Sequence, residues 1–481
     1  MRKKGRSPGF VGRDDELARL RLISESNKSS IVIVYGRRRV GKTTLIEKAF
    51  RDRNILKIEG LEQGGVQAQI ASAVRQLSAQ LPDRSISSWN PRNWEDLLRL
   101  VGTIVKDGCW TLYLEEYQWL SSYRNQLTSH LKLAWDNWLS KNPRLIVVLC
   151  GSSPSFMVNK VLRSKSLHNR SQHELHVKPL PFAEARKLLP SRTSLREAFD
   201  AYLLVGGIPE YLLRLGERSS CYLSFAHEAF SENGFFVNEF ERMIVSSLAH
   251  NPDFEKILRY LAKVSFCDRK ELARILGISP GGELSRLLQE LSLCGLIRQY
   301  VPLDKPENSL LQRLSIADPF LRTYFKNIAP RLTRIRHGSY NKAPESAVSY
   351  SELSAHLGYA FETLCVTKSA VIASTLGFSA VDYRAGSYFS RVASREIKNY
   401  QLDLIFQRAD QVHTISEIKY SLMPVDASVI APFERAISLY SRRVKQRVER
   451  VLITAAGATE SLKRKGYFDR VLTLAELAEE L

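Results

Sequence analysis

The stretch from Gly36 to Thr43, which reads GRRRVGKT, carries the clearest chemical signal in the sequence. It fits the pattern G-x-x-x-x-G-K-[ST], whose glycines let the backbone wrap phosphate groups while amides at a helix N-terminus point at them. Lys42 supplies a point charge to the β- and γ-phosphates, and the Thr43 hydroxyl supplies a ligand for Mg²⁺. An apolar run (31–35) precedes the loop and a helical pattern (44–50) follows it. The sequence therefore predicts a site for ATP or GTP with Mg²⁺.

The nucleotide-binding residues that this motif predicts are Gly36, Arg37, Arg38, Arg39, Val40, Gly41, Lys42, Thr43 and Thr44. A second apolar run (112–114) ends in Glu115 and Glu116, where related ATPases usually carry Asp followed by Glu. Glu115 takes the position that orients the Mg²⁺ shell, with one methylene more, and Glu116 is the candidate base for the attacking water. The alternative is an acidic pair that only ends a buried strand.

A third apolar run (145–150) is followed by Gly151, Ser152 and Ser153. AAA+ proteins place a polar residue that senses the γ-phosphate at the end of such a strand. Ser152 or Ser153 is the candidate for this role, and a simple turn is the alternative. We therefore predict Lys42, Glu116 and Ser152 as catalytic residues, with Thr43 and Glu115 at the metal.

Several motifs, in this order along the chain, resemble the archaeal-type ATPase family of the AAA+/STAND group. Besides the phosphate loop they are FVGRDDEL (10–17), KPL (178–180), GGIPEYL (206–212) and DPFLR (318–322). The resemblance implies that Val11, Gly12 and Arg13 lie against the adenine and that GGIPEYL belongs to a helical lid. It also implies that Arg170 is a phosphate-facing arginine and thus a fourth catalytic candidate, although a lone basic residue is more often simply solvated. The family's C-terminal domain, of unknown function, is similar to PD-(D/E)xK nucleases.

The segment from Arg269 to Ile297 has the order of a winged helix-turn-helix. A helical pattern stops at Gly277, a second helix is predicted over 283–294, and an extended run begins near Leu296. In DNA-binding members the second helix enters the major groove, and here it would expose Ser285, Arg286 and Gln289. The alternative is a winged helix that only packs against its neighbours.

Two strands are predicted near the C-terminus, over 401–407 and 414–420. Because residues two apart share one face of a strand, Glu417 and Lys419 project together, and a hairpin across 409–412 brings Asp403 beside them. Two carboxylates that bind Mg²⁺ and a lysine that positions water are the chemistry of PD-(D/E)xK nucleases, and Glu362 is a further acidic candidate. A second E-x-K, at 396–398, abuts a turn-like Asn399 and is less favoured. The alternative is a solvated sheet edge.

The expected fold class is α/β: a P-loop AAA+ core with a helical lid, a winged helix-turn-helix and a C-terminal α/β restriction-endonuclease-like domain. The core alternates apolar runs with amphipathic stretches, as a parallel sheet with crossover helices requires. The expected boundaries are 1–190 for the core, 191–250 for the lid, 251–332 for the winged-helix region with its following helix, 333–350 for a linker and 351–481 for the nuclease-like domain.

Composition indicates which partners and which cellular compartment to expect. The net charge of +20 attracts polyanions, and nucleic acid is the commonest one inside cells. The apolar runs fall far short of the roughly 20 residues that cross a bilayer, and no apolar core follows the basic start of the chain. Six cysteines without a C-x-x-C pair indicate reduced thiols. We expect a cytoplasmic protein with ATP and DNA as partners and no membrane, and self-association into a homo-oligomer stays open.

The leading hypothesis is a Mg²⁺-dependent ATPase that acts as a nucleotide-driven switch on DNA. Two alternatives belong to other classes. One is an ATP-regulated, metal-dependent DNA nuclease that acts through Glu417. The other is a nucleotide-gated signalling or binding protein without turnover, which the substitution at Glu115 favours.

Overall fold

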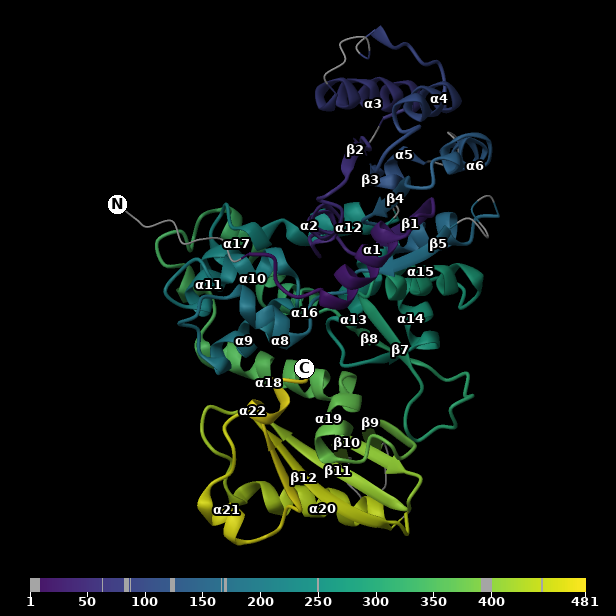
Figure 1. Ribbon diagram of the computed structural model, residues 1–481. Coiled ribbons are helices and arrows are strands. Elements are labelled where there is room, and N and C mark those ends of the chain that lie inside the picture. The colour runs from purple at the N-terminus through teal and green to yellow at the C-terminus, as the bar shows by residue number, and fades with distance from the viewer. Residues whose placement is uncertain are drawn as a thin grey trace.

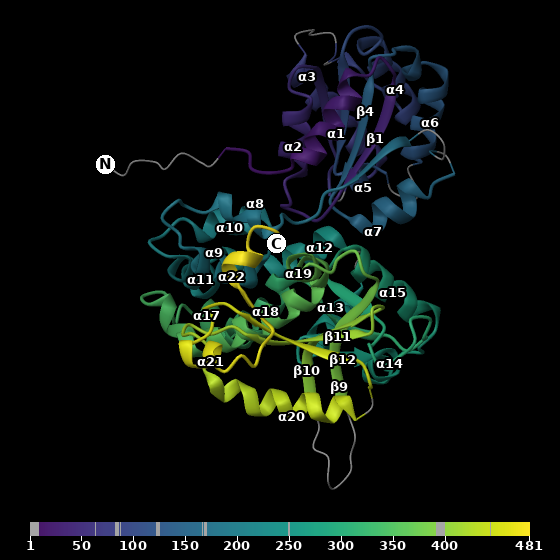
Figure 2. The same cartoon turned by 60° about the horizontal axis from the view of Figure 1, so that its bottom comes forward.

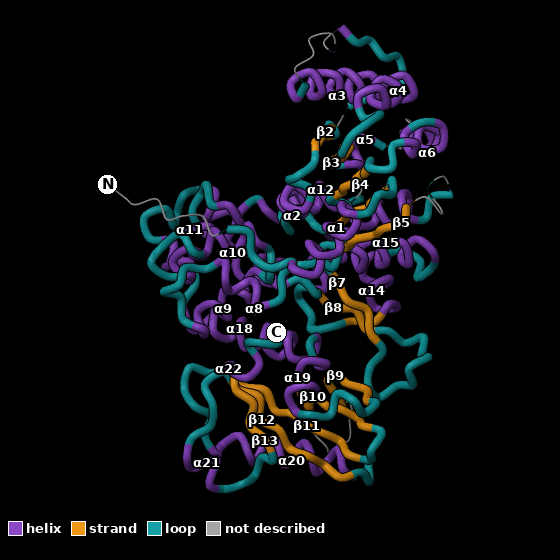
Figure 3. Tube along the Cα trace, in the orientation of Figure 1, coloured by secondary structure: helices purple, strands orange, loops and turns teal. Residues whose placement is uncertain are grey.

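The computed structural model describes residues 9–481 except 63, 82–85, 87, 122–125, 166, 168–170, 249–250, 391–399 and 443. Three sheets organise the described part of the chain, and helices surround them (Figures 1 and 3). The N-terminal sheet lies at the top of Figure 1 and the C-terminal sheet at the bottom. Of the helices in these described ranges, none is both long and apolar enough to span a bilayer.

The N-terminal sheet is parallel throughout, in the order β2-β3-β4-β1-β5. Its strands are β1 (Ser30–Tyr35), β2 (Asn54–Glu59), β3 (Trp110–Glu115), β4 (Ile146–Gly151) and β5 (Ser171–His176). The apolar runs correctly predicted β1, β3 and β4, whereas β5 was not predicted. Carboxyl ends of parallel strands meet at one edge, so the phosphate loop, Glu115 and Ser152 are brought together there.

Helices cover both faces of this sheet, which explains why its strands are apolar runs without alternation. They are α1 (Asp14–Glu25), α2 (Lys42–Ala49), α3 (Val66–Gln80), α4 (Trp94–Ile104) and α6 (Leu127–Asn137). Along β1, Val32 and Val34 pack with α1 and α2, while Ile31 and Ile33 pack with α3, α4 and α6.

A helical region follows the core, as the sequence predicted. It contains α8 (Phe182–Ala185), α9 (Leu195–Val205), α10 (Pro209–Leu215), α11 (Cys221–Phe230) and α12 (Glu239–Ser247). The turn between α9 and α10 needs glycine twice. Gly206 has φ 72°, and a Cβ on Gly207 would lie 1.9 Å from the carbonyl oxygen of Leu180. The KPL and GGIPEYL motifs therefore pack directly on each other, and Leu180 N donates to Gly207 O at 2.8 Å.

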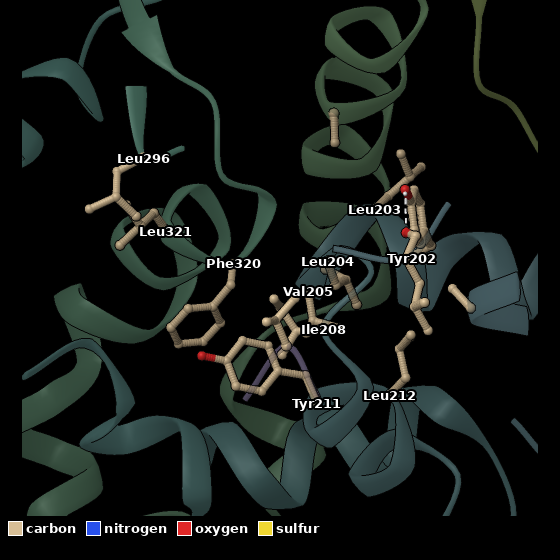
Figure 4. Packing of buried hydrophobic residues seen from close by; sticks show 14 of the residues in the cluster. Tyr202, Leu203, Leu204, Val205, Ile208, Tyr211, Leu212, Leu296, Phe320 and Leu321 are labelled. Atoms are coloured by element: carbon tan, nitrogen blue, oxygen red, sulfur yellow. Dashed lines mark hydrogen bonds between the residues drawn. The ribbon is translucent and has the colours of Figure 1, made fainter. Parts of the chain in front are cut away.

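Three more helices and a small antiparallel sheet come next. They are α13 (Pro252–Leu261), α14 (Arg269–Leu276) and α15 (Gly282–Leu293), with β6 (Cys267–Asp268), β7 (Ile297–Tyr300) and β8 (Arg313–Ile316) in the order β6-β8-β7. Gly277 ends α14 with φ 68°. Asp318 then caps α16 (Pro319–Thr323) by accepting a hydrogen bond from Leu321 N at 2.7 Å. Phe320 packs against Tyr211, with ring centroids 5.1 Å apart, and Leu321 belongs to the same buried core (Figure 4).

Residues 333–350, which we expected to form a linker, are packed against the helical region. They contain part of α17 (Leu332–Arg336) and buried side chains of Ile335, Tyr340 and Val348. Tyr222 of α11 donates from its hydroxyl to the carbonyl oxygens of Glu345 and Val348, at 3.2 and 3.1 Å.

The last sheet is mixed, in the order β13-β12-β11-β10-β9. Its elements are α18 (Tyr350–Thr367), α19 (Ser369–Leu376), β9 (Tyr383–Ser390), β10 (Tyr400–Arg408), β11 (Val412–Lys419), α20 (Ile430–Ser441), β12 (Arg447–Thr454), α21 (Glu460–Arg464), β13 (Arg470–Thr473) and α22 (Leu474–Leu477). The strands β9, β10 and β11 are antiparallel, and β12 and β13 continue parallel to β11. α20 runs along the outer face, and α18 packs between the sheet and α9 (Figure 2).

Candidate functional site

The phosphate loop joins β1 to α2 in a conformation that depends on its glycines. Gly41 has φ 94°, in the left-handed region that glycine adopts at little cost. A Cβ on Gly36 would lie 2.3 Å from the carbonyl oxygen of Val177, so only glycine fits beside β5. Lys42 is buried, and its Nζ donates to the carbonyl oxygens of Gly36 and Arg37 at 2.9 and 3.0 Å. These contacts hold the ammonium inside the loop.

Glu115 lies at the end of β3 and contacts the first turn of α2. Its Oε1 accepts hydrogen bonds from Thr43 Oγ1 and, at 2.8 Å, from the Tyr113 hydroxyl. Its Oε2 pairs with Lys57 of β2. Burial opposes ionisation, but the hydrogen bonds from Lys57, Thr43 and Tyr113 outweigh it and hold the pKa of Glu115 below its usual value. The carboxylate is therefore charged and touches the hydroxyl that the motif predicts as a metal ligand.

Glu116 extends the same strand end and contacts the end of β4. Its Oε2 accepts hydrogen bonds from Ser152 Oγ at 2.6 Å, from Ser152 N at 3.3 Å and from Gln118 Nε2 at 2.6 Å. The structure thus brings together Glu116 and Ser152, the two residues that we predicted from separate strands. The contact between them is direct.

A cavity of about 490 Å³ opens at this edge of the sheet. Its lining includes residues of the loop and α2, both strand-end glutamates and residues of the helical region: Arg38, Arg39, Gly41, Lys42, Thr43, Thr44, Glu59, Glu115, Glu116, Cys150, Pro209, Glu210 and Leu213. The GGIPEYL motif thus contributes one wall through α10. A triphosphate in this cavity would contact the core and the helical region together.

Two arginines of the loop are tied to distant residues. Arg37 is buried in an ion pair with Asp318. Arg39, with φ 66°, donates from Nε and Nη2 to the two carboxylate oxygens of Glu239 at 2.8 and 3.2 Å. Tyr211 donates to the same Glu239 Oε1 at 2.9 Å. Arg37 therefore links the phosphate loop to Asp318, far along the chain. Our prediction that Arg37 binds nucleotide did not include this contact.

The FVGRDDEL motif (10–17) contacts the phosphate loop through hydrogen bonds and packing. Arg13 is buried, and its Nη2 donates to the carbonyl oxygens of Val40 and Lys178 at 3.1 and 2.5 Å. Gly12 has φ 65° and lies against Glu184, whose Oε2 would be 2.0 Å from an added Cβ. Val11 packs at the edge of the core cluster. Arg170, the predicted phosphate-facing arginine, lies outside the described residues.

The four C-terminal candidates are neighbours across β10, β11 and α18. Asp403 Oδ2 accepts a hydrogen bond from Ile418 N at 3.1 Å, and Lys419 Nζ pairs with Glu417 Oε1 at 2.5 Å. Burial and the charge of Asp403 raise the pKa of Glu362 to about 7, and burial also raises the pKa values of Asp403 and Glu417. Within the described ranges, no set of three or more His, Cys, Asp or Glu side chains is arranged to hold a metal ion. The competing E-x-K at 396–398 lies outside the described residues.

The predicted groove-facing residues Ser285, Arg286 and Gln289 are exposed on α15. Two of them have local partners: Ser285 Oγ accepts from Arg269, and Arg286 donates to Glu290 at 2.9 Å. All six cysteines are free, and five of them are buried.

The chain is similar to several known proteins. No family model matches the chain. An uncharacterized ATP-binding protein of Methanocaldococcus jannaschii is 48% identical over 46 residues, which cover 10% of this chain and 78% of that protein. An uncharacterized protein of the same organism is 26% identical over 358 residues, or 73% of this chain and 75% of the relative. A solved structure, the Walker-type ATPase of Pyrococcus abyssi, has 19% identity and a TM-score of 0.48, covering 68% of this chain and 98% of its own.

Sequence reasoning missed several residues of this P-loop protein's site. Lys57 and Tyr113 share Glu115 with Thr43, and Gln118 shares Glu116 with Ser152. The period-two alternation of a strand puts Tyr113 and Glu115 on one face, which is a signal for the first contact. The contact of Lys57 with Glu115 could not be predicted from local patterns, because it depends on the strand order, which places β2 beside β3.

Proposed function

We propose that this P-loop protein is a Mg²⁺-dependent ATPase that works as a nucleotide-driven switch coupled to DNA. The observation that carries the proposal is the convergence of Lys42, Thr43, Glu115 and Glu116 on one cavity, which α10 of the helical region also lines. A phosphate loop alone would support binding. The additional strand-end carboxylate, held by Ser152, supports turnover.

The residues of the cavity fit a magnesium nucleotide. Thr43 and Glu115 place a hydroxyl and an ionised carboxylate in contact, which is the oxygen donor set that Mg²⁺ prefers. These two residues would hold the ion. A bound Mg²⁺ supplies charge neutralisation at the β- and γ-phosphates. Glu115 is longer than the usual Asp, yet its carboxylate reaches Thr43, so the extra methylene does not separate the two groups.

The chain's own residues then perform the remaining tasks. Backbone amides at the start of α2 bind phosphate oxygens, and Lys42 adds a positive charge that is already buried inside the loop. Glu116 orients the attacking water and accepts its proton, while Ser152 holds the carboxylate. Arg38 and Arg39 add positive charge at the mouth of the cavity.

The coupling to DNA is supported by the contacts of the loop with the regions that follow the parallel sheet. Arg39 joins the loop to Glu239, and Arg37 joins it to Asp318 at the start of α16. α16 follows the small sheet that carries α14 and α15, so a change in the loop reaches the helix with exposed Ser285, Arg286 and Gln289. The charge of +20 favours a polyanion as the partner.

The test is Mg²⁺-dependent ATP hydrolysis with and without DNA, in the wild type, Lys42→Ala and Glu116→Gln. We expect DNA-stimulated turnover that both substitutions abolish, with Lys42→Ala losing nucleotide binding and Glu116→Gln keeping it. Lys28→Ala, an exposed lysine ahead of β1, is the matched control and keeps full activity. Tight ATP binding without turnover under any condition would leave the non-hydrolysing, nucleotide-gated binding protein.

A second candidate function is metal-dependent DNA cleavage at the C-terminal sheet. It is favoured by the proximity of Asp403 and Glu417 to Glu362, whose pKa both carboxylates raise, and by the Glu417–Lys419 pair. Asp403 and Glu417 would hold the metal as two carboxylates. Cleavage of linear and supercoiled DNA with Mg²⁺ or Mn²⁺, lost in Glu417→Ala and kept in Glu460→Ala at an exposed site, is the expected outcome. No cleavage by the wild type with either metal contradicts this function.

A further inference from the structure

The side chain of Gln118 connects the two residues that the ATPase proposal places at the γ-phosphate. Gln118 lies in α5 (Tyr117–Leu120), directly after the strand-end glutamates. Its Nε2 donates to Glu116 Oε2 at 2.6 Å and to Ser152 Oγ at 3.0 Å, and Ser152 Oγ itself donates to Glu116 Oε2 at 2.6 Å. The three side chains therefore form a closed set of hydrogen bonds across the ends of β3 and β4.

The hydrogen bonds that Gln118 and Ser152 donate to Glu116 all reach the same oxygen, Oε2. Among the described residues, no hydrogen bond to Oε1 accompanies the three to Oε2. A carboxylate fixed through one oxygen keeps the other for a water in the cavity that Glu116 lines. General-base catalysis requires the base to lie within hydrogen-bond reach of the proton that it accepts, so this fixation bears directly on the rate.

The backbone conformation of Glu116 also favours this arrangement of hydrogen bonds. Glu116 has φ 50°, a conformation that a residue with a Cβ adopts only when its surroundings enforce it. Its carbonyl oxygen would be 2.9 Å from a Cβ on Gly60, at the end of β2. Gly151 leaves room for Met157 and Gln118, because a Cβ there would lie 2.5 Å from Met157 Sδ and 2.9 Å from Gln118 Oε1. The glycines at two strand ends thus accommodate Glu116 and Gln118.

The amide oxygen of Gln118 indicates that the role of this side chain is to donate hydrogen bonds from its amide nitrogen. Within the described part of the chain, Oε1 is buried and has no hydrogen-bond partner. A buried acceptor without a partner is costly, and a residue selected only for packing would not carry one. Its orientation places Nε2, and not Oε1, on the carboxylate and the serine.

We propose that Gln118 is a positioning residue for ATP hydrolysis, which holds Glu116 through Oε2 together with Ser152 so that Oε1 meets the attacking water. The inference rests on the proposed ATPase function. It assigns to Gln118 an effect on the chemical step and none on nucleotide binding, because the side chain does not line the cavity of the phosphate loop in the described structure.

The test compares Gln118→Met, which keeps the size of the side chain and removes the donor, with Gln67→Met at an exposed site on α3. In Gln118→Met we expect kcat to fall by about tenfold or more, a part of the usual general-base contribution, with nucleotide Kd within about twofold of wild type. In a Glu116→Gln background, which binds nucleotide without turnover, the same substitution leaves the nucleotide Kd unchanged, because Gln118 acts on the chemical step alone.

The outcomes separate the two proposals. Wild-type turnover with an unchanged kcat in Gln118→Met overturns the positioning role alone. A parallel loss of nucleotide affinity and of thermal stability in Gln118→Met overturns it as well, since that pattern describes a structural side chain. No turnover by the wild type under any condition removes the ATPase function, and the role of Gln118 with it.

Discussion

The guanidinium of Arg37, in the phosphate loop, forms a buried ion pair with the carboxylate of Asp318, 281 residues further along the chain. Burial alone would lower the pKa of Arg37, but the adjacent Asp318 raises it above its usual value. Asp318 also caps α16 through Leu321 N. One carboxylate thus links the loop to the segment that follows the small antiparallel sheet.

Removal of Asp318 should destabilise the whole protein strongly. Asp318→Ala leaves the buried charge of Arg37 without a partner, and breaking such a pair costs about 3–5 kcal/mol. Urea unfolding measures the loss. Asp52→Ala, whose partner Arg51 is exposed, is the control and should change stability by less than about 1 kcal/mol. An equally small effect of Asp318→Ala would contradict the importance of the buried pair.

The replacement of both partners gives a sharper test of the same pair. Arg37→Met with Asp318→Leu should recover part of the stability lost in Asp318→Ala, since well-packed apolar side chains remove the uncompensated charge. A double-mutant cycle measured by urea unfolding gives the coupling free energy. If the double variant is no more stable than Asp318→Ala, the loss arises from the helix cap and not from the charge.

Sequence patterns predicted the parts of this site that are local in the chain. The apolar runs of β1, β3 and β4, with the residues directly after them, indicated Lys42, Glu116 and Ser152, because parallel strands end at one edge. The partners of Arg37 and Arg39 could not be predicted in this way. They lie more than 190 residues away, and only the packing of α10, α12 and α16 on the core brings them close.

The sequence patterns also failed to predict strands of polar composition, and the reason is physical. β5 reads SQHELH and forms the edge of the parallel sheet, where one side of the strand lacks a neighbour and burial is incomplete. β9, at the edge of the C-terminal sheet, is similar. The stretch 333–350 has the composition of a linker, yet Ile335 and Val348 anchor it to the helical region. A few buried side chains outweigh the turn residues around them.

The stability of the protein should depend on pH through Glu115. Its folded pKa lies below the unfolded value of 4.5, so its contribution is present above that pH and is lost as the pH falls through the folded pKa. The difference in unfolding free energy between wild type and Glu115→Gln should therefore be largest at neutral pH and shrink in acid. Urea unfolding from pH 7 down to about 3 measures this difference, which stays constant if Glu115 is unperturbed.

The contact between Tyr420 and Asp200 should be needed to hold the C-terminal sheet on α9. Tyr420 follows Lys419 at the end of β11 and donates from its hydroxyl to Asp200 Oδ1. Arg196 lies over the Tyr420 ring, with Cζ 3.7 Å from the ring centroid. Tyr420→Phe removes a hydrogen bond to a carboxylate, which costs about 1.5–3 kcal/mol. Tyr350→Phe at an exposed tyrosine is the control, and equal stability of the two variants would contradict the prediction.

The raised pKa of Glu362 gives a pH dependence of the opposite sign. Burial and Asp403 raise its pKa to about 7, against the opposing charge of Lys419. Between the unfolded value of 4.5 and about 7 the folded state therefore binds more protons than the unfolded state, so this group makes stability fall as the pH rises. Glu362→Gln removes that penalty. Its stability relative to wild type should increase from pH 5 to pH 8 in the presence of a metal chelator.

The stability of Glu362→Gln relative to wild type should also depend on divalent metal, and this dependence tests the C-terminal site. If Asp403 and Glu417 hold a cation beside Glu362, added Mg²⁺ or Mn²⁺ stabilises the ionised carboxylates of the wild type, because the ion offsets their mutual repulsion. The advantage of Glu362→Gln at pH 8 then shrinks with metal concentration. Glu352→Gln, at a carboxylate that is fully exposed, shows no such dependence. An advantage that is the same with and without metal would show that the three carboxylates bind no ion.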